Sequence, residues 1–355
     1  MLVSYLCIES IMKTDKGINI WLLTGAIMII IMIIIGGITR LTGSGLSMVE
    51  WKVVGGIIPP LNEQDWIENF RKYKAFPEYQ LVNKGMTLDA YKQIYFWEYV
   101  HRMWGRLIGL VFFFPWLYFL IRKRLQGKMI AHSLILFCLG GLQAVVGWVM
   151  VKSGLVDIPE VSHYRLALHF SIALFLLCYI IRLLIILNPS PKWNLEKRNL
   201  SKWTLIFFIL ICIQIIYGAF MSGLKAGFVA PTFPLIIGEI LPDVAHRLNP
   251  WVRNIFENKV MIQFIHRTLG TLLLFIGVFL SLSYYKLGLK KISQALATII
   301  ITQFSLGVIT LLSFKNGMPV ALASLHQFVA IILLISVLYI HIKSKEANYC
   351  SDSIH

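Results

Sequence analysis

Eight stretches of this sequence contain no Asp, Glu, Lys or Arg, and their length restricts the fold more strongly than any other feature. A helix needs about 20 mostly apolar residues to cross a bilayer. Five stretches reach that length unaided, and three shorter ones reach it when each is extended at its N-terminal end. The predicted spans are Ile18–Ile38, Leu107–Ile121, Met129–Val151, Leu166–Ile181, Trp203–Leu224, Thr268–Tyr285, Ile292–Phe314 and Asn316–Ile342.

The composition agrees with a membrane protein and leaves no residues for a separate soluble domain. Of the 355 residues, 57% are hydrophobic and only 14% are charged, whereas a soluble domain carries about 25% charged residues. The longest segment between spans, about Arg40 to Tyr95, predicts an ordered loop with one or two short amphipathic helices. A second long loop, Gly223–Gln263, is rich in Pro and Gly. We therefore expect an all-α membrane protein with eight transmembrane helices.

The net charge of +16 is concentrated in the short connections that follow the even-numbered spans. Because Lys and Arg gather in cytoplasmic loops, both termini are predicted to be cytoplasmic. The positive charge is then a topology signal, and nucleic-acid binding is not expected. The chain reaches its first span within 17 residues and has no Arg- and Ser-rich presequence, which favours a bacterial inner membrane. No outer loop contains a cysteine, so no disulfide is expected there.

The two halves of the chain share three motifs in the same order. Glu98-x-x-His101-Arg102-x-x-Gly105 recurs as Gln263-x-x-His266-Arg267-x-x-Gly270, Gln143-x-x-x-Gly147 recurs as Gln303-x-x-x-Gly307, and Leu168-His169 recurs as Leu325-His326. The predicted halves, residues 1–190 and 191–355, each hold four spans, so both begin on the cytoplasmic side. We expect two four-helix bundles related by a pseudo-two-fold axis along the membrane normal.

Four of the nine histidines belong to this repeat. They lie at the N-terminal ends of spans two, four, six and eight, and the topology places them at one depth, in the outer leaflet. Ionisable residues at membrane depth are costly and usually functional. A neutral imidazole is a good axial ligand for heme iron, and two helices that run the same way can place one imidazole on each face of a porphyrin. The sequence predicts one such site from His101 with His169 and another from His266 with His326. Zinc would call for carboxylate or thiolate ligands, which the second half lacks nearby.

Glycine and arginine accompany the first histidine of each predicted pair. Gly105 and Gly270 lie four residues after their histidines, on the same helical face, where a missing side chain leaves room for a flat macrocycle. Arg102 and Arg267 follow the histidines directly. Each arginine can pair with a heme propionate or extend to lipid phosphates.

The two halves differ at one position that has chemical consequences. Glu98 lies about one helical turn before His101, whereas its counterpart in the second half is Gln263. A carboxylate beside a heme can accept a proton, and an amide cannot. The first half is thus predicted to carry out chemistry and the second to transfer electrons. Alternatively, Glu98 pairs with Arg102 or caps the helix.

Several motifs together resemble the heme A synthase family, and the resemblance spans nearly the whole chain. The matching segments are Thr42-Gly-Ser-Gly-Leu-Ser-Met48, Glu50-Trp-Lys52, Pro59-Pro60, Glu98-x-x-His101-Arg102 and His266-Arg267. Some bacterial members carry a cysteine pair in the first outer loop. This chain has none there, so it resembles the cysteine-free subclass with a long first loop that is found in bacteria and mitochondria.

The resemblance implies oxidation of heme O to heme A, in which a ring methyl becomes a formyl group by successive hydroxylations. It implies that His101 and His169 surround the substrate heme in residues 1–190. It also implies that His266 and His326 hold a permanent heme b cofactor in residues 191–355. The expected partners are heme O as substrate and the lipid bilayer, with heme O synthase and cytochrome oxidase assembly factors as further candidates.

Two other classes of function use the same predicted ligands. A di-heme b-type membrane electron carrier would modify neither heme and would purify with two stoichiometric hemes of one type. A heme transporter or chaperone would bind heme loosely and make no heme A. The Thr42–Met48 segment and Glu98 favour the enzyme, an oxidoreductase acting on a CH or CH2 group.

Overall fold

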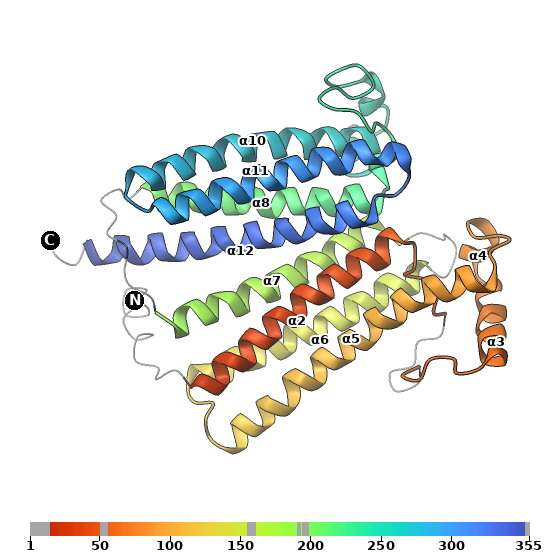
Figure 1. Cartoon of the computed structure of the whole chain (residues 1–355), viewed down its shortest axis with the longest axis horizontal. Helices are drawn as coiled ribbons and strands as arrows, with labels where there is room; N and C mark the ends of the chain where they lie inside the picture. The colour runs from red at the N-terminus through yellow and green to blue at the C-terminus, as the bar shows by residue number, and fades with distance from the viewer. Residues whose placement is uncertain (1–14, 50–55, 155–160, 190–192, 194–198, 352–355) are drawn as a thin grey trace. The chain divides into compact units, whose positions relative to one another are not determined.

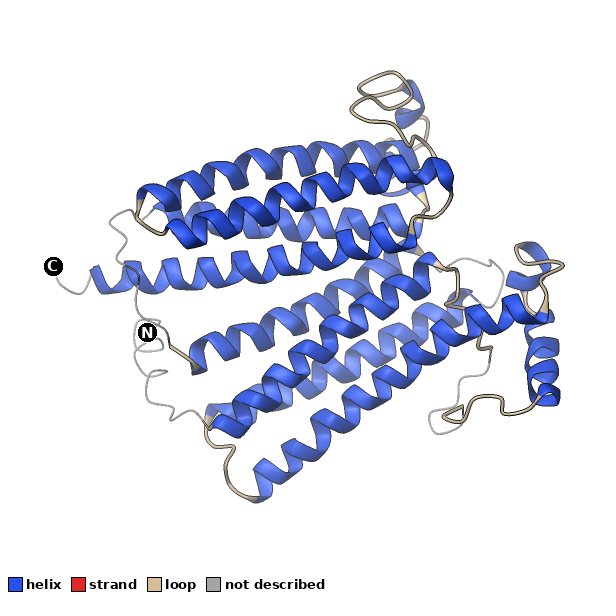
Figure 2. Cartoon of the chain, viewed as in Figure 1, coloured by secondary structure: helices blue, strands red, loops and turns tan. Residues whose placement is uncertain are grey.

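A computed structural model describes residues 15–49, 56–154, 161–189, 193 and 199–351. Helices and loops make up these residues, and the described part of the chain contains no β-strand, only an isolated bridge between Ile236 and Glu239 (Figure 2). Eight of the helices are long and apolar enough to cross a membrane. The prediction of an all-α protein with eight membrane-spanning helices is therefore confirmed.

Each of the eight predicted spans corresponds to one long helix (Figure 1). Their bounds are α2 Lys16–Leu41, α5 Leu88–Ile121, α6 Lys128–Gly154, α7 His163–Leu187, α8 Asn199–Gly223, α10 Lys259–Lys286, α11 Lys290–Ser313 and α12 Val320–Ser351.

Polar caps, which hydropathy does not register, extend several helices beyond the predicted spans. The Thr87 hydroxyl accepts a hydrogen bond from the N–H of Ala90 at 3.2 Å, so α5 begins at Leu88 and the predicted end of the loop at Tyr95 is wrong. His101 consequently lies well inside α5 and not near its N-terminal end. Similarly, the Asn258 side chain accepts hydrogen bonds from the first turn of α10.

The last predicted span starts too early. Residues 314–316 form a 3-10 turn, and Gly317 has a φ of +108°, a backbone conformation that favours glycine. Helix α12 therefore begins at Val320 and not at Asn316.

The chain divides into two compact units, residues 24–177 and residues 1–23 with 178–355. In the second unit, α10 and α12 each pack against both α8 and α11, which closes a four-helix bundle. In the first unit, the Trp104 indole donates to the Met28 carbonyl at 2.9 Å and joins α5 to α2. The Trp116 indole donates to the Ser133 hydroxyl at 3.1 Å and joins α5 to α6. The boundary at residue 190 and the pseudo-two-fold axis stay predictions.

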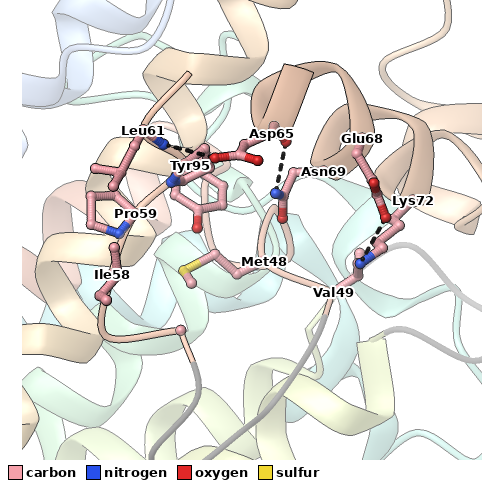
Figure 3. A pocket seen from close by; sticks show the side chains of 12 residues that line it. Met48, Val49, Ile58, Pro59, Leu61, Asp65, Glu68, Asn69, Lys72 and Tyr95 are labelled. Carbon is pink, nitrogen blue, oxygen red and sulfur yellow. Dashed lines mark hydrogen bonds and ion pairs between the residues drawn. The ribbon is translucent and has the colours of Figure 1, made fainter. Parts of the chain in front are cut away.

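The first long loop contains two short helices, α3 Glu63–Lys74 and α4 Pro77–Leu81, as its sequence predicts. Aromatic side chains at 66, 70 and 73 lie on one face of α3 and pack against Tyr91 and Tyr95 of α5. The Tyr73 hydroxyl donates to the Glu78 carboxylate at 2.9 Å, and burial raises the pKa of Tyr73. Beside this cluster lies an open cavity of about 490 Å³, lined in part by Met48 and Asp65 (Figure 3).

The second long loop is ordered by short helices and by one buried side chain. The helices are η2 Ala226–Phe228, η3 Asp243–His246 and α9 Arg253–Glu257. The buried Asn254 amide bonds both the N–H and the carbonyl of Leu248, at 3.0 and 2.9 Å. The Asn258 amide at the start of α10 donates to the Val244 carbonyl at 2.8 Å, which holds the loop against the N-terminal end of that helix.

Candidate functional site

The first predicted histidine pair is brought together inside the first unit. His101 lies on α5 and His169 on α7, and the two imidazoles are near enough to interact electrostatically. Each ring packs against a glycine of the preceding long helix. A Cβ atom on Gly36 of α2 would lie 3.2 Å from Nε2 of His101, and one on Gly147 of α6 would lie 2.8 Å from Cε1 of His169. Any larger residue at these positions would displace the ring.

The second predicted pair has the same arrangement in the second unit. His266 of α10 and His326 of α12 interact electrostatically. A Cβ atom on Gly218 of α8 would lie 3.4 Å from Cε1 of His266, and one on Gly307 of α11 would lie 3.0 Å from Cε1 of His326. Four glycines thus give four histidines the space that their rings occupy.

Glutamine amides contact three of the four histidines. The Gln143 amide donates to the carbonyl oxygen of His169 at 3.0 Å, and the Gln214 amide donates to that of His266 at 2.9 Å. The same two amide nitrogens lie 3.4 Å from Nε2 of the histidine rings. The Gln303 amide nitrogen lies 3.5 Å from Nε2 of His326.

The donor set of these sites suits a heme. Nδ1 of His169, His266 and His326 is buried without a hydrogen-bond partner, so protein groups alone do not satisfy these imidazoles. Heme iron takes one axial ligand on each face, and a histidine pair provides both. Over the described residues, no three His, Cys, Asp or Glu side chains gather closely enough to hold a metal ion by themselves. The residues present therefore fit a heme better than a zinc ion.

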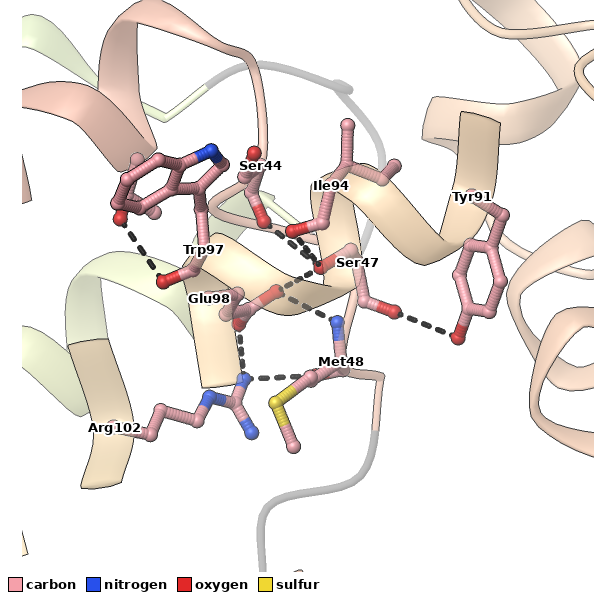
Figure 4. Close-up of polar contacts among 9 residues, drawn as sticks. Ser44, Ser47, Met48, Tyr91, Ile94, Trp97, Glu98 and Arg102 are labelled. Carbon is pink, nitrogen blue, oxygen red and sulfur yellow. Dashed lines mark hydrogen bonds and ion pairs between the residues drawn. The ribbon is translucent and has the colours of Figure 1, made fainter. Parts of the chain in front are cut away.

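Glu98 is buried and holds the segment that follows α2 against α5 (Figure 4). Its Oε2 accepts hydrogen bonds from the Ser47 hydroxyl at 2.7 Å and from the Met48 N–H at 2.6 Å. Its Oε1 pairs with Arg102, which also donates to the Met48 carbonyl at 2.8 Å. The pairing with Arg102 that the sequence left as an alternative is thus present. A role in proton transfer stays a prediction.

Gln263 and Arg267 perform the corresponding task in the second unit. The fully buried Gln263 amide donates to the Ala230 carbonyl at 3.2 Å, and Arg267 donates to the same carbonyl at 2.7 Å. The loop after α2 presents an N–H and a hydroxyl to a carboxylate, whereas the loop after α8 presents carbonyls to an amide. The difference between Glu98 and Gln263 therefore also matches the polarity of the groups that each one binds.

Sequence reasoning missed the residues that cover the histidines and the glycines. A Cβ atom on Gly105 would lie 3.4 Å from Cε of Met32, and one on Gly270 would lie 3.1 Å from Nε2 of Gln214. Helix α2 thus lies close to Gly105, and helix α8 lies close to Gly270. The role of these two glycines in making room for a macrocycle remains a prediction. The signal was present in the pattern Gln214-x-x-x-Gly218, which repeats Gln143-x-x-x-Gly147.

Together, the helices and the site define a multi-pass α-helical membrane protein with two partly buried histidine pairs that suit heme. The chain belongs to the COX15-CtaA family, described as cytochrome oxidase assembly protein, whose model matches residues 19–338. The family resemblance of the motifs is thereby confirmed.

Several curated relatives in this family are named heme A synthase. One from Wolbachia pipientis wMel is 44% identical over 326 residues, covering 91% of each chain. One from Flavobacterium psychrophilum is 43% identical over 338 residues, covering 92% of this chain and 98% of its own. One from Rhodospirillum centenum is 40% identical over 323 residues, covering 90% of this chain and 86% of its own.

Proposed function

We propose that this protein oxidises heme O to heme A, so that a ring methyl of the substrate becomes a formyl group through successive hydroxylations. The reaction makes it an oxidoreductase acting on a CH or CH2 group and supplies heme A for cytochrome oxidase. The observation that carries the proposal is the presence of two partly buried histidine pairs in a chain that is 40–44% identical to proteins named heme A synthase.

The two histidine pairs are proposed to have different tasks. His101 and His169 surround the substrate heme, and His266 and His326 hold a permanent heme b, which supplies electron transfer when bound. Arg102 anchors the substrate near its propionates, and Arg267 has the same task at the second site. Nε of Arg267 is buried without a partner, which supports a further acceptor at this position.

Glu98 is the proposed proton acceptor for the reaction. Its carboxylate accepts hydrogen bonds from three donors, the Ser47 hydroxyl, the Met48 N–H and the Arg102 guanidinium. A carboxylate has about four lone-pair positions, so these contacts leave one for a proton from the substrate side. Gln263 has no such capacity, which supports assigning the chemistry to the first unit.

The proposed setting is a bacterial inner membrane with both termini in the cytoplasm and both heme sites in the outer leaflet. The positive charge of the connections after the even-numbered spans supports this orientation. The proposed partners are heme O synthase and cytochrome oxidase assembly factors. The absence of cysteine from the first long loop supports assignment to the cysteine-free subclass.

The heme composition of the purified protein tests the proposal against the main alternative. Protein purified from cells that make heme O should contain low-spin heme b together with heme O, heme A or a partly oxidised form. A di-heme b-type electron carrier would instead contain two stoichiometric hemes b. Finding only two hemes b, with no oxidised form under any supply of heme O, would contradict the proposal.

A further inference from the structure

A motif of two residues faces each of the four histidines, and it lies on the long helix that precedes the histidine's own helix. One residue is the glycine that contacts the ring, and the other lies four residues earlier, on the same helical face. The four motifs are Met32-x-x-x-Gly36, Gln143-x-x-x-Gly147, Gln214-x-x-x-Gly218 and Gln303-x-x-x-Gly307. The first motif alone has methionine in place of glutamine.

The glutamines can prepare their histidines to bind iron. An amide N–H is a donor, so its approach to within 3.4–3.5 Å of Nε2 favours the tautomer in which Nε2 carries a lone pair and Nδ1 carries the proton. A lone pair on Nε2 is what an iron ligand needs, and the amide would give up this contact when heme binds. Gln143 and Gln214 also bond the backbone carbonyl of the histidine and so hold the helix itself in place.

Met32 cannot do the same for His101. The terminal methyl of Met32 on α2 faces Gly105, and the amide of Gln214 on α8 faces Gly270 in the same way. A thioether has no proton to donate and is only a weak acceptor. His101 therefore lacks the contact that orients the other three rings, although Gly36 gives it the same space.

We propose that methionine at position 32, in place of a glutamine that would orient His101, makes the first heme site exchangeable. Both ligands of the second pair are oriented by glutamine, which suits a heme that stays. In the first pair only His169 is oriented in this way, which suits a substrate that enters and a product that leaves. The inference rests on the proposed function for its biological meaning, but it concerns heme release and can be measured without turnover.

The test measures transfer of heme from the full-length protein to an excess of apomyoglobin. The protein is first loaded with ferric heme b at both sites, and loss of heme should show a fast phase from the first site and a slow phase from the second. Removal of a group that orients a metal ligand typically changes affinity 10–100-fold. Met32→Gln should therefore slow the fast phase about tenfold or more, and Gln214→Met should accelerate the slow phase by a similar factor.

Met32→Leu is the matched control, because it changes the side chain without adding a donor; its fast phase should remain about tenfold or more faster than that of Met32→Gln. The low-spin spectrum of the second site reports folding in the Met32 variants, and thermal stability in membranes reports it in Gln214→Met. If Met32→Gln and Met32→Leu release heme at the same rate, the proposal is overturned. If the release rates change as expected but heme O is never oxidised, the proposed function fails and this inference stands.

Discussion

Glu98→Gln replaces the buried carboxylate one helical turn before His101 with the residue that the second unit has at the same position. The substitution nearly preserves volume but removes the charge that Ser47, Met48 and Arg102 bind. Hydrogen bonds to charged groups contribute about 1.5–3 kcal/mol each. The amide also places a donor, in one orientation or the other, against the Met48 N–H or the Arg102 guanidinium. Looser attachment of the loop after α2 is therefore part of the expected effect.

A second effect is chemical. A general acid or base contributes about 10²–10⁴ in rate, so Glu98→Gln should lower heme A output at least 100-fold if Glu98 accepts a proton. Heme O or a hydroxymethyl form should accumulate, and the heme b content of the second unit should stay normal. The assay is chromatography of hemes extracted from cells that coexpress heme O synthase, with protein amount measured in the same membranes.

Ser47→Ala separates the two effects, because it removes one donor from Glu98 and keeps the carboxylate. If Glu98 is the proton acceptor, Ser47→Ala should retain heme A output within about tenfold, the equivalent of about 1.4 kcal/mol. If Glu98 only attaches the loop, the two variants should lose thermal stability and output together. Wild-type output from Glu98→Gln would refute the proposed role altogether.

Three further predictions concern the second unit and the orientation of the chain. His266→Ala should abolish the stable low-spin heme b spectrum, and unchanged low-spin bands would rule out the assignment of this pair. Gly307→Ala should weaken heme b retention, because the alanine Cβ would lie 3.0 Å from the His326 ring. Visible spectra during heme titration measure the affinity, and a wild-type affinity would contradict the prediction. A reporter that is active only outside the cytoplasm should work within residues 223–263 and fail after Lys291, and the reverse pattern would overturn the topology.

The helices could be predicted from the sequence because the hydropathy of a segment indicates directly whether it can span a membrane. Their ends could not, because they depend on single polar caps such as Thr87 and Asn258. The extra turns of α5 moved His101 well inside its helix. Gly317 and its left-handed backbone shortened the last predicted span in the same local way.

The four histidines could also be predicted, because ionisable residues at membrane depth are rare and these recur in a repeat. Their surroundings depend on contacts between helices. Met32 and Gln214 differ in chemistry, so the sequence does not show that they occupy equivalent positions. The structure shows it, because Met32 faces Gly105 and Gln214 faces Gly270. The presence of Glu98 in one half and Gln263 in the other is also explained by the backbone groups that each side chain binds. Those groups, the Met48 N–H and the Ala230 carbonyl, can be identified only from the structure.

The most direct test of the account is chromatography of hemes extracted from cells that lack their own heme A synthesis and coexpress this chain with heme O synthase. The account predicts that heme A appears with the wild-type chain and disappears with His101→Ala, while heme b in the second unit remains. Unmodified heme O in the wild-type cells, with both sites of the purified protein filled by heme b, would contradict it.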